Sequence, residues 1–144
     1  MTAQFCRVMT YNIHGGLDHR NQPSLELIGE TIAQCLPDLA GLQEVERGFR
    51  ARAGFADQPA HLGRQLGMDF RFAAAINLFP APARGKFGNA ILSGWPIVSA
   101  WAERLPWRRE PRVLLGTAIE SPWGRLYFLV CHLGLHQGER ARQV

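Results

Sequence analysis

The chain has 144 residues, which is long enough to bury the hydrophobic core of one ordinary domain and too short for two. It is 47% hydrophobic with a net charge of +4, and it contains no run of about 18 apolar residues, which excludes a membrane-spanning helix. Because the first residues lack the pattern of a signal peptide, we expect one cytoplasmic domain over residues 1–144.

The basic residues are almost all of one kind, with fifteen arginines against Lys86 alone. Arginine binds phosphate oxygens through two parallel N–H groups, so this excess is compatible with a phosphorylated substrate. A coding bias of the source genome explains the same excess, and we favour that explanation; the excess does not establish a phosphorylated substrate.

The first third of the sequence predicts a parallel βαβ unit. Apolar residues indicate a strand over Phe5–Tyr11, and Ser24 then marks the start of a helix that Pro37 ends. A short buried strand, Leu39–Gln43, follows. The apolar positions of the helix share one face because they recur every three or four residues: Leu25, Ile28, Ile32 and Leu36.

The middle of the chain predicts one helix and one strand between two loops. An arginine-rich loop, Arg47–Asp57, precedes a short helix from about Pro59 to Leu66. A strand over Met68–Ala74 follows. The next segment, Asn77–Gly85, has two prolines and a glycine and predicts a loop, which is a candidate element of substrate specificity.

Short β segments dominate the rest of the chain, separated by Pro96, Pro106 and a hairpin signal at Ser121-Pro122-Trp123-Gly124. A final helix is predicted to begin near Leu135 or His136. The strand candidates are Gly88–Ser93, Ile97–Leu105, Val113–Glu120 and Arg125–Cys131.

Two polar residues stand out because each follows an apolar run: Asn12 in the segment Thr10–Gly15, and Glu44 in the segment Leu42–Val45. An amide and a carboxylate delivered at strand ends suit a hard, oxygen-ligated cation such as Mg²⁺. In the structural alternative, Asn12 caps a turn and Glu44 is a solvated strand end. The aspartates are few, namely Asp18, Asp38, Asp57 and Asp69, and a metal-dependent hydrolase is expected to need more carboxylates than these.

Four segments occur in a recognisable order: Met9–Gly15, Pro37–Val45, Gly88–Ser93 and Val130–Leu133. Together they resemble the endonuclease/exonuclease/phosphatase (EEP) superfamily of Mg²⁺-dependent phosphoesterases, and the likeness runs from about Arg7 to Gln143. It implies an α/β fold, about half of a four-layer α/β sandwich (DNase I-like), with a mixed sheet and flanking helices. Because the chain supplies roughly the first half, we expect mostly one sheet, whose inner face has lost its partner.

The resemblance also implies roles for individual residues. It places Asn12 and Glu44 beside Mg²⁺ (or Mn²⁺). It places His132 where a family histidine hydrogen-bonds or protonates the phosphate under attack, a role suited to a near-neutral pKa. Cys131 replaces the usual small polar residue before it, and the alternative is a histidine satisfied at a strand end. Three further residues are expected to approach the substrate: His14, Asn89 and Arg112.

Other positions refine these implications. Some nuclease branches of the family have an aspartate at the position of His14, so the histidine favours the broader hydrolase branch over a DNA-repair nuclease. Asn89 and Arg112 are equally explained as structural residues. The helix that follows His132 is expected to carry His136, Arg140 and Gln143.

Family members carry a Gly-Asp-x-Asn motif and a final Ser-Asp-His motif downstream, and neither occurs in this sequence. The resemblance therefore implies the N-terminal part of a Mg²⁺-dependent phosphoesterase that hydrolyses a phosphodiester or phosphomonoester and is inactive alone. The expected partners are the missing C-terminal half of the same fold and a phosphate-ester substrate. That substrate is a nucleic acid, an inositol phosphate or a phospholipid headgroup.

Two other functions remain open at this stage. The arginines and the four tryptophans suit a non-catalytic module that binds a nucleic acid or a phospholipid headgroup. Tryptophans in predicted strands are, however, more often part of the core than stacking platforms. The third possibility is a fragment with no independent function.

Overall fold

The predicted βαβ unit is confirmed in the computed structural model, which describes residues 5–78 and 85–144. Strand β1 (Val8–Asn12), helix α1 (Leu25–Cys35) and strand β2 (Leu39–Arg47) follow one another, and β1 pairs in parallel with β2. The helix begins after Ser24, as predicted. It ends at Leu36, whose φ of 48° lies in the left-handed region, before a proline that cannot continue the helix.

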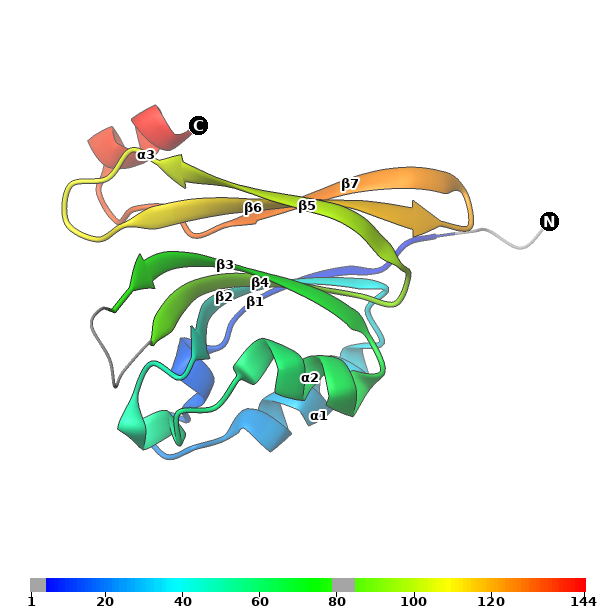
Figure 1. Cartoon of the computed structure of the whole chain (residues 1–144), viewed down its shortest axis with the longest axis horizontal. Helices are drawn as coiled ribbons and strands as arrows, with labels where there is room; N and C mark the ends of the chain where they lie inside the picture. Colours follow the sequence, from blue (N-terminus) through cyan, green and yellow to red (C-terminus); the bar gives the residue numbers. More distant parts are fainter. Residues whose placement is uncertain (1–4, 79–84) are drawn as a thin grey trace.

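The first sheet is mixed and has the strand order β1-β2-β4-β3. Strand β4 (Lys86–Ser93) runs antiparallel to β2 and to β3 (Asp69–Asn77). Helix α2 (Gln58–Leu66) packs with α1 on one face of this sheet (Figure 1). Apolar side chains from both helices and from the sheet form the core there; among them are Ile28, Ile32, Leu42, Leu62 and Leu92.

The last three strands form a sheet of their own, so the expectation of mostly one sheet is wrong. Strands β5 (Ile97–Leu105), β6 (Arg112–Ser121) and β7 (Gly124–Cys131) are antiparallel neighbours in that order. The predicted hairpin is confirmed, with Ser121 opposite Gly124. Alternation of apolar residues identifies a strand but not the sheet that it joins, and this is why the sequence did not predict the division.

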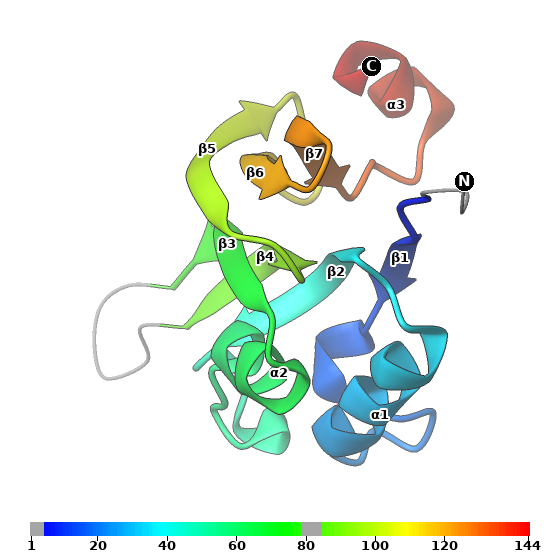
Figure 2. The ribbon, with the colours of Figure 1, turned by 90° about the vertical axis from the view of Figure 1, so that its right-hand side faces the viewer.

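The two sheets pack face to face, so the inner face of the first sheet keeps a partner within the chain. Figures 1 and 2 show three layers: the helices α1 and α2, the first sheet, and the second sheet. The core between the sheets is apolar and includes Leu39, Ile91, Val113, Leu115, Ile119 and Val130. Buried apolar area of this kind is the main source of folding free energy.

The exposed apolar face is instead the outer side of the second sheet. Trp101 on β5 is 41% exposed and Tyr127 on β7 is 66% exposed, and their rings lie 6.4 Å apart. Trp107 and Trp123 are also exposed. The expectation that tryptophans in predicted strands belong to the core is therefore wrong for Trp101, which lies in the predicted strand Ile97–Leu105.

Three short helical segments complete the fold: η1 (His14–Gly16), η2 (Ala51–Ala53) and α3 (Gln137–Gln143). The final helix was predicted, and it starts one residue after the expected position. Of the predicted specificity loop, residues 79–84 lie outside the described residues. Within the described ranges, none of the helices is long and apolar enough to cross a membrane.

Candidate functional site

The segments predicted to carry chemistry gather at one end of the molecule. The parallel strands β1 and β2 end at the same edge of the first sheet. Strand β7 contacts β2 and ends on the same side, where α3 also lies (Figure 1). Loops at the carboxyl ends of parallel strands commonly carry binding sites, because the strands fix their positions.

Asn12, the last residue of β1, is hydrogen-bonded to Glu44 in β2. Its Nδ2 donates to Glu44 Oε1 at 2.8 Å, and its Oδ1 accepts from the backbone N–H of His14 at 3.0 Å. The bond to His14 is the turn-capping role that the sequence left open. Nδ1 of His14 lies 3.6 Å from Glu44 Oε2. Three of the predicted site residues are thus in mutual contact.

Glu44 lies inside β2, at a bulge, and not at the end of a strand as predicted. The register between β2 and β4 shifts between Leu42 and Val45, so that Gln43 and Glu44 together face the single residue Asn89. Glu44 has a φ of 57°, a left-handed conformation that is uncommon for a residue with a side chain. Bulges re-aim side chains, and this one brings the Glu44 carboxylate, 25% exposed, against Asn12.

Two buried polar residues that the sequence analysis missed, Gln58 and Glu46, lie behind the η1 turn, and Gln58 holds the turn in place. Gln58 Nε2 donates to the backbone oxygen of Gly15 at 2.7 Å, and its Oε1 accepts from the backbone N–H of Glu46 at 2.8 Å. Both side chains are 1% exposed. Glu46 Oε1 lies 3.0 Å from Nη1 of Arg50. The sequence did contain one signal for this pair: Glu46 is a second carboxylate two residues after Glu44.

The Glu46 carboxyl group is subject to two opposing influences on its pKa. Burial raises the pKa of Glu46, and the Arg50 guanidinium opposes this shift. A carboxylate with so little exposure needs such a cation to remain charged. Glu46 and Arg50 therefore form an ion pair directly beneath the turn that follows Asn12.

His132, the residue after β7, connects the two sheets electrostatically. Burial is the main cause that lowers its pKa below the ordinary value of 6.5, and the Arg112 guanidinium lowers it further. The carboxylates of Glu44 and Glu110 act in the opposite direction. His132 is therefore within reach of charges from both sheets, and at neutral pH its neutral imidazole can donate one hydrogen bond and accept another.

Arg112 and Asn89 are buried at this end, between the two sheets. Nη1 of Arg112 lies 3.2 Å from Glu110 Oε1, and its buried Nε has no hydrogen-bond partner among residues 5–78 and 85–144. Asn89 Nδ2 donates to the backbone oxygen of Val113 at 2.8 Å, which ties β4 to the start of β6. This bond supports the interpretation of Asn89 as a structural residue. Contact of Asn89 or Arg112 with the substrate stays a prediction.

Residues of the last helix make structural contacts. Arg140 and Gln143 lie on α3 as predicted, and His136 is the residue before its first turn. Gln143 Nε2 donates to the backbone oxygen of Pro106 at 2.7 Å, and its Oε1 accepts from the backbone N–H of Gly134 at 2.8 Å. These bonds fix the helix against the segment between β5 and β6.

The donor set fits a weakly held divalent cation. Glu44 offers a carboxylate and Asn12 an amide oxygen, which keeps one lone pair beyond the bond from His14. In the described part of the chain, no three or more histidine, cysteine or acidic side chains cluster as a metal site. Mg²⁺ normally keeps several waters and uses one or two carboxylates plus substrate phosphates, so two protein oxygens are sufficient for a partial site.

The sequence and the fold both match known proteins. A family model described as the Endonuclease/Exonuclease/phosphatase family matches residues 9–135. An endonuclease/exonuclease/phosphatase structure from Beutenbergia cavernae has 24% identity and a TM-score of 0.79, covering 96% of this chain and 42% of that one. A mannosyl-6-phosphatase from Bacteroides thetaiotaomicron has 15% identity and a TM-score of 0.72, covering 96% and 56%. D. rerio TDP2, complexed with a single-strand DNA product, has 16% identity and a TM-score of 0.62, covering 93% and 48%.

These structural likenesses establish a DNase I-like fold, and the chain spans about half the length of each matched structure. A search of curated proteins finds no match. Members of the matched family are hydrolytic phosphoesterases and nucleases, and they generally use divalent metals. The match includes Asn12, Glu44 and His132, the residues that the fold brings to one end. This chain therefore belongs to the endonuclease/exonuclease/phosphatase family.

Proposed function

We propose that this chain provides the metal-binding and phosphate-binding part of a phosphoesterase that hydrolyses a phosphodiester or a phosphomonoester. The observation that carries the proposal is the 2.8 Å hydrogen bond between Asn12 Nδ2 and Glu44 Oε1. A strained bulge supports this contact, and strained backbone of this kind is often found at functional sites. Family membership supports the type of reaction.

In this proposal, Asn12 and Glu44 hold Mg²⁺ or Mn²⁺ through their side-chain oxygens. When bound, such a cation neutralises phosphate charge and lowers the pKa of a coordinated water. His14 orients the carboxylate from the side of the η1 turn, since its Nδ1 lies 3.6 Å from Glu44 Oε2. Gln58 keeps that turn in place through its bond to Gly15.

His132 and Arg112 act on the phosphate. During hydrolysis, water attacks phosphorus, the ester P–O bond breaks, and negative charge is spread over the non-bridging oxygens. The neutral His132 imidazole donates a hydrogen bond to one of these oxygens, and Arg112 supplies a fixed positive charge. Asn89 holds the strand that carries Arg112 through its bond to Val113.

The group that removes the proton from the attacking water lies, in this proposal, outside these 144 residues. The chain has four aspartates and none after Asp69. The similar structures are about twice as long as this chain. We therefore propose that a C-terminal half of the same fold provides the base, and that the isolated chain turns substrate over slowly or not at all.

The proposal is tested by Mn²⁺ binding, followed by electron paramagnetic resonance. The wild-type chain is expected to bind Mn²⁺, and Glu44→Gln is expected to weaken binding by about ten-fold or more. The control Glu103→Gln removes an exposed carboxylate on β5 and is expected to leave binding unchanged. Equal binding by the wild type and Glu44→Gln would exclude the proposed metal site.

Phosphate chemistry is tested on the same proteins. Bound Mn²⁺ is expected to broaden the ³¹P signals of p-nitrophenyl phosphate and bis(p-nitrophenyl) phosphate with the wild type and not with Glu44→Gln. The ester that responds identifies a monoester or a diester site. Rapid Mg²⁺-dependent hydrolysis by the isolated chain would contradict the proposal that the base lies elsewhere.

The alternative, a non-catalytic binding module, is supported by the exposed rings of Trp101 and Trp107. Aromatic rings of this kind stack on the bases of single-stranded nucleic acid. Binding of an oligonucleotide that persists in EDTA, falls steeply with salt and is lost in Trp101→Ala would favour this alternative. Binding that requires Mn²⁺ and Glu44 would favour the phosphoesterase.

A further inference from the structure

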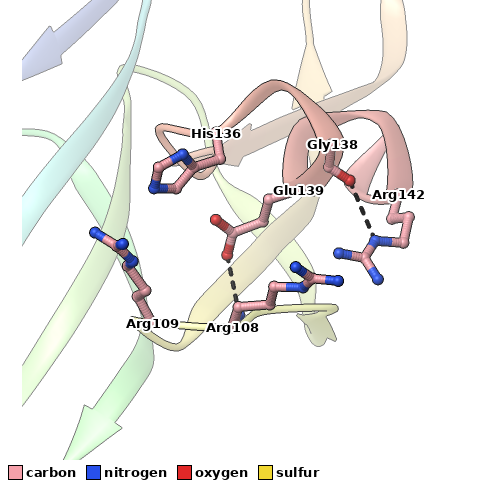
Figure 3. Close-up of a pocket in the computed structure, with 6 residues that line it drawn as sticks. All are labelled: Arg108, Arg109, His136, Gly138, Glu139 and Arg142. Atoms are coloured by element: carbon pink, nitrogen blue, oxygen red, sulfur yellow. Dashed lines mark hydrogen bonds between the residues drawn. The ribbon is translucent and has the colours of Figure 1, made fainter.

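A cavity lies between α3 and the segment that joins β5 to β6. It has a volume of about 440 Å³ and is lined by Arg108, Arg109, His136, Gly138, Glu139 and Arg142. We call it the arginine pocket. Figure 3 shows Arg109 and His136 on one side of Glu139, and Arg108 and Arg142 on the other.

The arginine pocket carries an excess of positive charge. Three guanidinium groups line it against the single carboxylate of Glu139, whose Oε1 accepts a hydrogen bond from the backbone N–H of Arg108 at 3.2 Å. Arg142 Nε donates to the backbone oxygen of Gly138, at 3.2 Å. Within residues 5–78 and 85–144, the guanidinium groups of Arg108 and Arg109 form no hydrogen bond or ion pair.

Five other arginines each lie in an ion pair with a carboxylate. Ion pairs with aspartate or glutamate are made by Arg47, Arg50, Arg71, Arg112 and Arg125. Like charges held close together repel, so an unpaired group of guanidinium ions is stabilised by an anion. Phosphate, like carboxylate, matches their planar N–H geometry and accepts two parallel hydrogen bonds from a guanidinium group.

The walls of the pocket are held in place before any ligand binds. Buried Glu139 fastens α3 to the backbone of Arg108, and Gln143 fastens the same helix to Pro106. Gln143 also accepts a hydrogen bond from Gly134 N–H. Binding therefore costs the entropy of ordering a few arginine side chains and not of ordering a loop.

A smaller cavity of about 140 Å³ lies next to the arginine pocket, on the side of Arg112. It shares Arg109, His136 and Glu139 with the arginine pocket, and its other lining residues are Leu135 and the ion pair of Glu110 with Arg112. Arg112 in turn acts electrostatically on His132. A substrate whose reacting phosphate meets His132 and Arg112 can thus place a second anionic group among the unpaired arginines.

We propose that the arginine pocket binds a second phosphate group of the substrate, separate from the phosphate that is hydrolysed. This inference rests on the proposed function, because it requires that the other phosphate of the same substrate binds at His132 and Arg112. The shared chemistry is a phosphate oxyanion held by two or three guanidinium groups. A bisphosphorylated sugar and a 5′-phosphorylated dinucleotide both provide it.

The test compares ligands that differ by one phosphate, by isothermal titration calorimetry in EDTA. The pairs are glucose 1,6-bisphosphate with glucose 1-phosphate, and a thymidine dinucleotide with and without its 5′-phosphate. The second phosphate is expected to raise affinity by about ten-fold in at least one pair, since each charge-assisted hydrogen bond contributes roughly this much. The pair that responds identifies the source of the phosphate.

The gain is expected to disappear in the double variant Arg108→Gln/Arg109→Gln and, separately, to fall in Arg142→Gln. Arg64→Gln is the matched control, because Arg64 is exposed on α2 and no hydrogen bond or ion pair of its guanidinium group lies within the described residues. A second phosphate that adds no affinity, or a gain that survives both sets of substitutions, would overturn the proposal.

Glu44→Gln separates this proposal from the proposed function. In EDTA it is expected to keep the gain from the second phosphate, although it loses Mn²⁺ binding. Glu44-dependent Mn²⁺ binding without that gain rejects the arginine pocket alone. A gain that depends on the arginines, without Glu44-dependent Mn²⁺ binding, rejects the proposed metal site and leaves an anion site.

Discussion

The side chain of Gln58 is hydrogen-bonded to the backbone oxygen of Gly15 at 2.7 Å, across 43 residues of sequence. Its other end accepts from the backbone N–H of Glu46 at 2.8 Å. One buried amide thus connects α2, β2 and the turn that follows Asn12. A buried amide with both ends satisfied specifies a single arrangement of the three segments.

Replacing Gln58 with leucine is therefore expected to reduce stability. Gln58→Leu keeps a similar volume but leaves the Gly15 oxygen and the Glu46 N–H buried without partners, which costs about 2 to 4 kcal/mol in total. Gln34→Leu is the control, because Gln34 is exposed on α1 and its side chain makes no hydrogen bond within residues 5–78 and 85–144; a change within about 0.5 kcal/mol is expected there. Urea denaturation measures both, and equal effects would show that the buried amide is not needed.

Gly88 allows the close approach of β3 and β4 next to the bulge. A Cβ at this position would lie 2.0 Å from the backbone oxygen of Ala73 and 2.9 Å from the backbone nitrogen of Ala75. Gly88→Ala is expected to cost about 3 kcal/mol or more, because backbone has to shift. In Gly94→Ala, the new Cβ meets only Asp38 O at 3.6 Å, and a small change in the unfolding free energy is expected.

Sequence patterns predicted the helices, most strand positions and the parallel βαβ unit, because these depend on local spacing. They did not predict the bulge at Glu44, since a bulge depends on unequal residue counts in two strands that are distant in sequence. The division into two sheets was missed for a related reason. Which strands pair outside a hairpin depends on contacts between segments that are distant in sequence, and local patterns do not record these contacts.

The sequence predicted residues of the candidate site only where they belong to a family motif. Asn12, Glu44 and His132 lie in recognisable segments. Gln58 has an ordinary local sequence, and its importance comes from burial against a turn far along the chain. Arg109 and Arg142 meet in one pocket although no sequence spacing relates them.

Asn12→Asp tests whether the contact with Glu44 marks a cation site. In the metal-free protein, a second carboxylate would replace the amide that now donates to Glu44 Oε1 at 2.8 Å, so the melting temperature is expected to fall through like-charge repulsion. Mg²⁺ is expected to raise the melting temperature of this variant more than that of the wild type, because a cation binds only the folded pair.

Asn77→Asp introduces the same charge at an exposed position at the end of β3, and no special response to Mg²⁺ is expected from it. Differential scanning calorimetry with EDTA and with Mg²⁺ makes the comparison. If Asn12→Asp and Asn77→Asp respond equally to Mg²⁺, the Asn12–Glu44 contact is not a cation site.

The charges around His132 predict opposite pKa changes in two variants. Arg112→Gln is expected to raise the pKa of His132, because the guanidinium lowers it, and Glu44→Gln is expected to lower the pKa further, because the carboxylate raises it. Nuclear magnetic resonance titration of the His132 imidazole measures both, with Glu103→Gln as the control. Shifts in the same direction would show that His132 does not lie between the two charges.

The lowered pKa of His132 also makes the free energy of unfolding depend on pH. Because the folded pKa of His132 lies below its ordinary value of 6.5, the unfolded chain binds more protons between the two values. The contribution of His132 to the free energy of unfolding is therefore lost as the pH falls from above 6.5 through that window. His132→Gln removes this contribution, so urea denaturation at about pH 7.5 and about pH 5 should show a smaller difference than in the wild type. An unchanged difference would mean that His132 is as accessible to protons in the folded chain as in the unfolded one.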